Sequence, residues 1–103
     1  MEDTNYNAEE YIDIEEYSKK GKNPPKGKKY LIKVDKVLYK VEVESLIGSE
    51  ILELAGKTPT VRFQLNLKLH GGVVKKVGYD ERIEFTEPGI ERFMTIPLDQ
   101  TEG

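Results

Sequence analysis

The chain has 103 residues, enough for one small domain, and its 37% hydrophobic and 34% charged residues are typical of a globular protein with some disordered length. A formal net charge of −3 is too small to indicate a nucleic-acid partner, and no apolar run is long enough to span a membrane. Without cysteine, disulfides, thiolate metal sites and a cysteine nucleophile are excluded. The acidic N-terminus differs from a secretory signal, so we expect a cytoplasmic protein.

The first 29 residues are sorted by charge. Residues 1–18 contain seven acidic and no basic side chains, whereas residues 19–29 contain six lysines and no acid. The rest of the chain is nearly balanced, which marks a boundary just ahead of the strand-like run that starts at Tyr30. We therefore predict a charged N-terminal arm over residues 1–29 and a globular domain over residues 30–98.

The arm contains a weak helix pattern over residues 8–20. Asn7 and Glu10 fit a capping box and Gly21 suits the C-terminal end of a helix. The apolar stripe is thin, however, and a helix of this length is marginal in water. The favoured interpretation is a flexible, solvated tether. The alternative is a helix that docks on this domain or on a partner.

Residues 30–56 predict a hairpin and then a helix. Two runs rich in alternating apolar residues, 30–35 and 37–43, are joined tightly through Asp35–Lys36. The hairpin positions expected to face one core are Ile32, Val34, Val37, Tyr39, Val41 and Val43. A short helix follows from Gly48 and stops at Gly56, and its apolar stripe is Ile51, Leu54 and Ala55.

The next segment has the clearest alternation in the chain. Every second residue from Val61 to Leu69 is apolar, which predicts a half-buried strand with a polar outer face and with Phe63 and Leu65 inside. Gly71–Gly72 ends it in a loop that requires positive φ. Short extended segments follow at residues 73–77, 81–85 and 90–97, and the last of them leaves open whether Phe93 or Met94 faces inward.

This order of hairpin, helix, long strand, short strand and last strand predicts an α+β fold, with the helix packed across a mixed sheet. It resembles ubiquitin, and two stretches resemble the multi-ubiquitin domain family of bacteria. These stretches are Gly48–Gly56, with the pattern Gly-x-x-Ile-Leu-x-Leu-Ala-Gly, and Thr86–Phe93, with Thr-Glu-Pro-Gly-x-Glu-Arg-Phe. The resemblance covers about Tyr30 to Leu98 and implies a ubiquitin-like β-grasp domain. Family members often occur as tandem copies, and this sequence has one copy.

The resemblance also implies a protein modifier that is activated at a C-terminal glycine, here Gly103. An E1-like enzyme would adenylate the glycine carboxylate with ATP, and an E2-like enzyme would pass the acyl group to lysine amines of a target protein. A deconjugating peptidase is the third implied partner. ATP belongs to the activating enzyme, and no metal or cofactor is expected on this chain. The flexible tail over residues 99–103 would reach the active sites, with enzyme contacts expected at Leu98, Asp99, Gln100, Thr101 and Glu102.

No catalytic residue is expected on the chain itself. The single histidine, His70, lies at the exposed end of the long strand, and no serine elbow or glycine-rich phosphate loop is present. The polar outer face is interpreted equally as a plain solvated face or as a docking face, formed by Arg62, Gln64, Asn66, Lys68 and His70. Two alternative functions stay open: a binding module that is never conjugated, and a sulfur carrier. Sulfur carriers normally end in Gly-Gly, whereas this chain ends in Glu102–Gly103.

Overall fold

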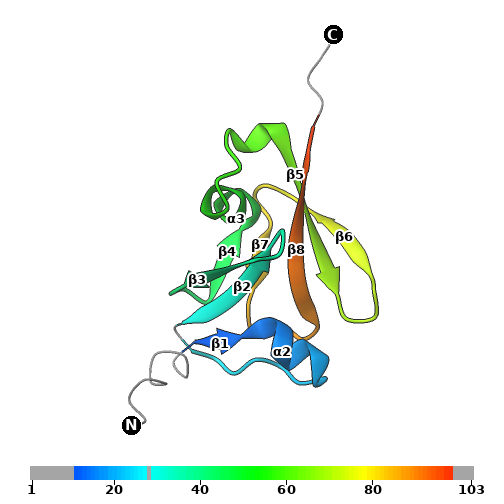
Figure 1. The fold of residues 1–103 in the computed structure, drawn as a ribbon. Coiled ribbons are helices and arrows are strands. Elements are labelled where there is room, and N and C mark those ends of the chain that lie inside the picture. The colour runs from blue at the N-terminus through cyan, green and yellow to red at the C-terminus, as the bar shows by residue number, and fades with distance from the viewer. Residues whose placement is uncertain (1–10, 28, 99–103) are drawn as a thin grey trace.

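The structure is a computed structural model, and it describes residues 11–27 and 29–98 (Figure 1). It shows an α+β fold in which a mixed sheet of several strands is combined with one main helix. In chain order the elements are β1 (Ile12–Asp13), α2 (Ile14–Lys19), β2 (Tyr30–Val34), β3 (Val37–Val41), β4 (Ser45–Ile47), α3 (Gly48–Leu54), the short 3-10 turn η2 (Thr60–Arg62), β5 (Phe63–Leu69), β6 (Val74–Val77), β7 (Arg82–Glu84) and β8 (Ile90–Pro97). Among the described residues, no helix is long and apolar enough to cross a membrane.

The last strand of the chain lies in the middle of the main sheet (Figure 1). β8 runs parallel to β2 on one side, where Val34 pairs with Phe93, and antiparallel to β5 on the other. β6 pairs antiparallel with β5, β3 pairs antiparallel with β2, and β1 adds a short parallel pairing to β2. The beginning and the end of the domain therefore meet at the centre of the sheet.

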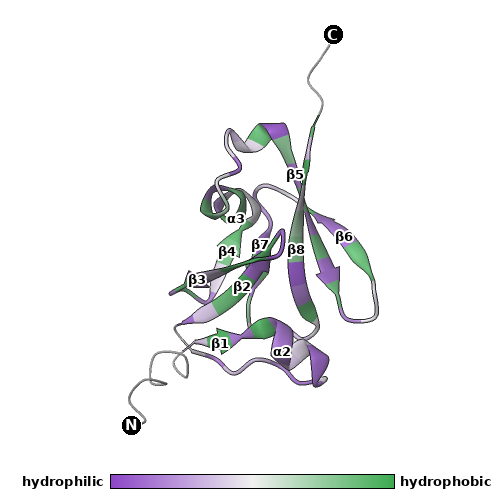
Figure 2. Cartoon of the chain, viewed as in Figure 1, coloured by the Kyte–Doolittle hydropathy of each residue, from purple (hydrophilic) through white to green (hydrophobic). Residues whose placement is uncertain are grey.

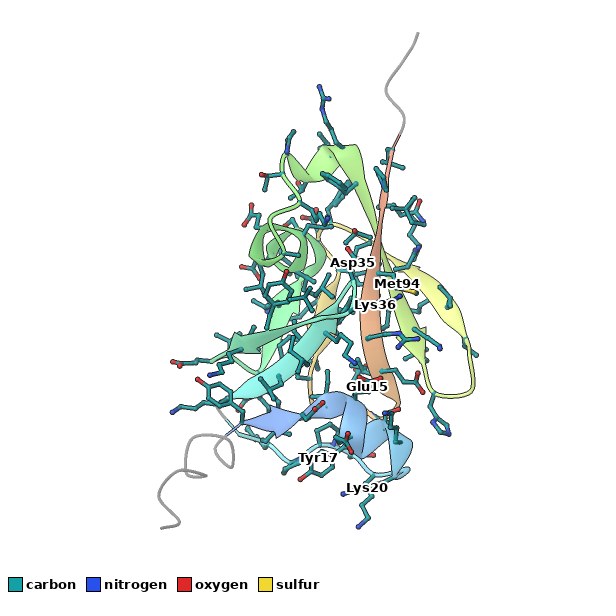
Figure 3. All side chains as sticks on the ribbon, viewed as in Figure 1. Glu15, Tyr17, Lys20, Asp35, Lys36 and Met94 are labelled. Atoms are coloured by element: carbon teal, nitrogen blue, oxygen red, sulfur yellow. The ribbon has the colours of Figure 1, made fainter. Side chains whose placement is uncertain are left out.

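The predicted hairpin is confirmed, and its turn is tied to the last strand. Asp35 and Lys36 have φ of 50° and 71°, the left-handed conformation that a two-residue hairpin turn favours. The N–H of Asp35 donates to the carbonyl oxygen of Phe93 at 3.0 Å. The Asp35 carboxylate accepts from the N–H of Thr95 at 2.9 Å and from the hydroxyl of the same residue. Asp35 thus holds the hairpin against β8, beside which it lies in Figure 3.

The inward faces of the strands and of α3 form a hydrophobic core. Hydrophobic and hydrophilic residues alternate along the main strands in Figure 2, as expected for a sheet with one buried face. Ile32, Val34 and Val41 are buried as predicted, whereas Val37 and Val43 are 50% and 45% exposed. The prediction was wrong for these two because Val37 directly follows the turn and Val43 lies beyond the end of β3.

The predicted helix is confirmed as α3, although its buried face differs. Ile51 is fully buried as expected, but the second fully buried side chain is Leu52, while Leu54 and Ala55 are only partly buried. Gly56 follows the end of the helix with φ of 76°. Just before α3, β4 pairs with β7 in a separate two-stranded sheet that the sequence did not predict.

Two local irregularities decide which side chains of β5 and β8 face the core. Because η2 precedes β5, Val61 is exposed, although the alternation placed it in the strand. Leu65 is fully buried as predicted, and Phe63 is only partly buried. In the pairing of β5 with β8 a register shift brings Ile90 and Phe93, three positions apart, both into the core.

The N-terminal segment packs on the domain, so the predicted solvated tether is wrong for residues 11–27. Ile14 is 1% exposed and belongs to the hydrophobic core. The hydroxyl of Tyr30 donates to the carbonyl oxygen of Pro25 at 3.0 Å and accepts from the N–H of Gly27 at 2.8 Å. The folded unit therefore begins well before the expected boundary at residue 30, and α2 docks on this domain.

α2 begins later than predicted, because the residues before it pair with β2 as β1. The expected capping box at residues 7–10 lies outside the described residues. Instead Asp13 caps the helix, since its carboxylate accepts from the N–H of Glu15 at 3.1 Å. The Glu15 carboxylate then lies 2.9 Å from the ammonium of Lys33 and 3.9 Å from the guanidinium of Arg92. These ion pairs connect α2, on which Figure 3 labels Glu15, to β2 and to β8.

Candidate functional site

The chain leaves the sheet at the end where β5 begins. Pro97, the last residue of β8, pairs with Phe63, and the N–H of Leu98 donates to the carbonyl oxygen of Arg62 at 2.8 Å. Leu98 is 36% exposed and is the last described residue. Gly103, the predicted acyl carrier, lies outside the described residues together with the other expected tail contacts, which are Asp99, Gln100, Thr101 and Glu102.

A pocket of about 240 Å³ lies directly beside this exit point. It is formed by β5, β6, the turn after β6 and the end of the described chain. Its lining residues are Gln64, Leu65, Lys76, Val77, Gly78, Tyr79 and Leu98. Leu65 and Val77 are almost fully buried, so the accessible apolar walls come from Tyr79 and Leu98. This pocket was not predictable from the sequence, because its walls come from three segments that are distant along the chain.

Hydrogen bonds from α3 and β5 hold the turn that carries Tyr79. At the start of α3 the N–H of Gly48 donates to the carbonyl oxygen of Glu81 at 3.0 Å, and the N–H of Ser49 donates to that of Tyr79 at 2.9 Å. The hydroxyl of Tyr79 donates to the carbonyl oxygen of Phe63 at 2.7 Å. The aromatic wall of the pocket is therefore fixed at its backbone and at the tip of its ring.

Gly48→Ala should destabilise the domain, because a β-carbon at this position would overlap the carbonyl oxygen of Gly78. Because the obstructing atoms belong to the backbone of the turn after β6, a side-chain rotation cannot relieve the overlap, and α3 has to move away from this turn. We expect a loss of about 1–3 kcal/mol in the free energy of unfolding, measured by denaturant titration. Gly78→Ala is the matched control, since its added β-carbon meets only ordinary contacts with Glu81 and should change stability by no more than about 0.5 kcal/mol. Equal stabilities of the two variants would contradict the close approach.

Glu81 closes the same turn and makes it sensitive to acid. The N–H of Gly78 donates to the carboxylate at 3.0 Å and lowers the pKa of Glu81 below its ordinary value. Partial burial opposes this shift of the Glu81 pKa, and the ammonium of Lys75, 3.4 Å away, supports it. Because the folded-state pKa lies below the unfolded one, ionised Glu81 stabilises the turn above the unfolded pKa, and this contribution is lost as the pH falls through the folded pKa.

In NMR spectra recorded over a pH series, the amide chemical shift of Gly78 should accordingly change with a midpoint below the ordinary glutamate pKa of about 4.3. The transition should be missing in Glu81→Gln, which keeps an oxygen acceptor without an ionising group. Glu84→Gln, at an exposed position on β7, is the control that should leave the transition in place. A Gly78 amide that does not titrate in the unaltered protein would show that the hydrogen bond is absent in solution.

The five residues of the predicted docking face do not form one open polar surface. Arg62 lies in η2 rather than in β5, and Asn66 is buried and accepts from the side-chain amide of Gln64 at 3.0 Å. Lys68 and His70 lie 3.8 and 3.7 Å from the two carboxylate oxygens of one glutamate of β8. Of the five, Arg62 and His70 are classed as exposed. Within residues 11–27 and 29–98, no group of three histidine or carboxylate side chains could hold a metal ion.

β8 adds apolar side chains to the same outer face. In the antiparallel pairing Met94, labelled on β8 in Figure 3, lies opposite Asn66, and Ile96 lies opposite Gln64. Ile96 is 45% exposed and Met94 is partly buried. Neither residue was predicted on this face, because the alternation of the last strand did not decide whether Phe93 or Met94 faces inward. Once Phe93 faces inward, alternation places Met94 and Ile96 on the outer side.

Comparisons with known proteins identify no relative: no family model, no curated protein and no solved structure matches the chain.

Proposed function

We propose that the protein is a ubiquitin-like modifier with a β-grasp fold, of the kind that acts in bacterial ubiquitin-like conjugation in the cytoplasm. The supporting observation is the arrangement around β8. From Tyr30 on, the chain forms a hairpin, a helix, a long strand and two short strands, and the last strand then fills the centre of the sheet, parallel to the first hairpin strand. The chain leaves this central strand at one end of the sheet, next to exposed apolar side chains.

In the proposed reaction the carboxylate of Gly103 attacks the α-phosphate of ATP in an E1-like enzyme, and pyrophosphate leaves. A thiolate of the partner attacks the acyl carbon and releases AMP. After transfer to the thiol of an E2-like enzyme, a target lysine amine displaces that thiol and forms an amide. The chain contains no cysteine, so every thiol in this relay belongs to a partner. A deconjugating peptidase would hydrolyse the amide again.

The chain contributes position and access rather than catalysis. Hydrogen bonds from β2, β5 and the η2 turn fix β8 up to Leu98, so the tail starts from a defined point. Residues 99–103 span at most about 18 Å when extended. Glycine at the reacting position has no side chain to obstruct a narrow channel and adopts most backbone conformations.

The proposal is tested by incubating the chain with ATP, Mg²⁺ and the E1-like and E2-like enzymes of its host. We expect an ATP-dependent product in which a lysine of the target carries the sequence Gln100-Thr101-Glu102-Gly103 through an amide bond, identified by mass spectrometry after proteolysis. Omission of ATP is the control. If neither an adenylate nor an amide-linked product forms with active enzymes, the modifier hypothesis is wrong.

A binding module that is never conjugated is the second candidate. The observation that favours it is the exposed side chain of Ile96 beside the partly buried Met94 on the outer sheet face, because a contiguous apolar patch on a small domain often marks a binding surface. This function would persist when the tail is removed, whereas conjugation would not.

A further inference from the structure

We propose that the pocket beside Leu98 is the docking site of the E1-like adenylating enzyme and accepts one apolar side chain of that enzyme. This inference rests on the proposed function and adds to it the surface by which the chain is held while its tail is in the active site. Three properties of the pocket support it: its position beside Leu98, the last described residue, the chemistry of its walls and the rigidity of those walls.

The tail beyond Leu98 is short, so an enzyme that acts on its end has to approach the domain. The proposed reacting glycine, Gly103, lies five positions beyond Leu98, and five residues span at most about 18 Å. An enzyme that encloses the Gly103 carboxylate must therefore come within that distance of Leu98. Such an enzyme lies close to the exit point of β8, and the pocket opens beside this point, with Leu98 as one of its walls.

The pocket has apolar walls and a polar rim. Leu98 and Tyr79 present apolar surface to solvent, each with 36% of its area exposed. Gln64 and Lys76 complete the rim with polar groups. A volume of about 240 Å³ is smaller than the pockets that hold cofactors or drug-sized ligands, which start at about 300 Å³. Its size and lining suit a single apolar anchor of a protein partner, the arrangement that usually carries most of the binding energy of an interface.

Hydrogen bonds fix the walls of the pocket before any partner binds. The backbone of Tyr79 is bonded to the start of α3, and its hydroxyl is bonded to the carbonyl oxygen of Phe63. Leu98 is held by its hydrogen bond to Arg62. Binding to walls that are fixed in advance costs little conformational entropy, so one anchor side chain can contribute strongly to affinity.

The test measures ATP–pyrophosphate exchange by the E1-like enzyme as a function of the concentration of the full chain. Leu98→Ser and Tyr79→Ser should each raise the half-saturating concentration about tenfold, as expected for the loss of a central interface contact. The rate at saturation should stay unchanged, because the Gly103 carboxylate is intact. The double variant should show less than the product of the two single effects, since both walls contact the same anchor.

Val73→Ser is the matched control. It also replaces an exposed apolar side chain, next to the opposite end of β6, and should leave the half-saturating concentration unchanged. The thermal midpoint of Tyr79→Ser shows whether the turn is still folded. If that variant does not fold, Lys76→Glu at the exposed rim replaces it and should raise the half-saturating concentration in the same direction.

Two outcomes would overturn the inference. Wild-type saturation curves for the pocket variants would mean that the enzyme does not use this surface. A lowered half-saturating concentration would mean that the pocket holds the chain's own tail and that the variants release it. Failure of the proposed function looks different, because the unaltered chain and the Val73→Ser control would then support no exchange at any concentration.

Discussion

Deleting residues 1–27 should unfold the domain or bring it close to unfolding. The deletion removes Ile14 from the core, takes away both hydrogen-bond partners of the Tyr30 hydroxyl, and leaves Lys33 and Arg92 without the Glu15 carboxylate. The summed loss is several kcal/mol, against a total stability of about 5–10 kcal/mol for a domain of this size. The loss of the cooperative transition in thermal unfolding, followed by circular dichroism, is the measurement.

A point variant separates packing from chain length. Ile14→Ala should cost about 2–5 kcal/mol in the free energy of unfolding, because the side chain is fully buried and leaves a cavity. Glu16→Ala, on the exposed side of the same helix, is the control and should change stability by less than about 0.5 kcal/mol. If Ile14→Ala and the deletion variant unfold at the same denaturant concentration as the parent chain, the N-terminal segment does not pack in solution. The domain would then begin at residue 30.

Deleting Gly103 should abolish ATP-dependent conjugation while leaving the free energy of unfolding unchanged. The new terminal residue would be Glu102, whose long and charged side chain has to enter the channel in place of glycine. Stability should be unaffected because Phe93 is the last fully buried of the described residues, and the last described backbone hydrogen bond joins Leu98 to Arg62 of η2. Gel shift and mass spectrometry of the products, beside denaturant titrations of both proteins, measure the two properties separately.

Gly103→Ala refines the same experiment. It keeps a terminal carboxylate at the original distance from Leu98 and adds one methyl group, so residual conjugation should remain. Conjugation that survives the deletion of Gly103 at full rate would contradict an acyl carrier at this position. A biological activity that survives the deletion without any conjugate would instead support the binding module.

The parts of the fold that were predictable depend on local patterns. The Asp35–Lys36 turn, the α3 segment and the inward-facing Leu65 follow from neighbours within a few residues. Gly71 and Gly72 likewise have φ of 90° and 86°, as the loop after the long strand requires. Each of these features is determined by a short stretch of sequence, and none depends on a distant partner.

The features that were missed depend on distant partners or on single irregular residues. The thin apolar stripe and the marginal helix length pointed to solvent for the N-terminal segment, but the burial of a few side chains such as Ile14 decides its position. β4 and β7 are three residues each and become a sheet only by pairing with one another. The phase of β8 was undetermined because a register shift near Lys68 interrupts the alternation. The pocket required both β8 and the turn after β6 to be placed first.

The central position of β8 also determines how the domain responds to mechanical force. A pull on the tail acts along the axis of β8, and the hydrogen bonds to its neighbours run across this axis, so the pull loads them together rather than one after another. The hydrogen bonds of Asp35 to Phe93 and Thr95 also have to break when β8 is pulled out of the sheet. A force on β3, by contrast, acts on an edge strand that can be peeled from β2 pair by pair. Among the strands of the main sheet, the one nearest to the proposed attachment point is therefore the one most resistant to extraction.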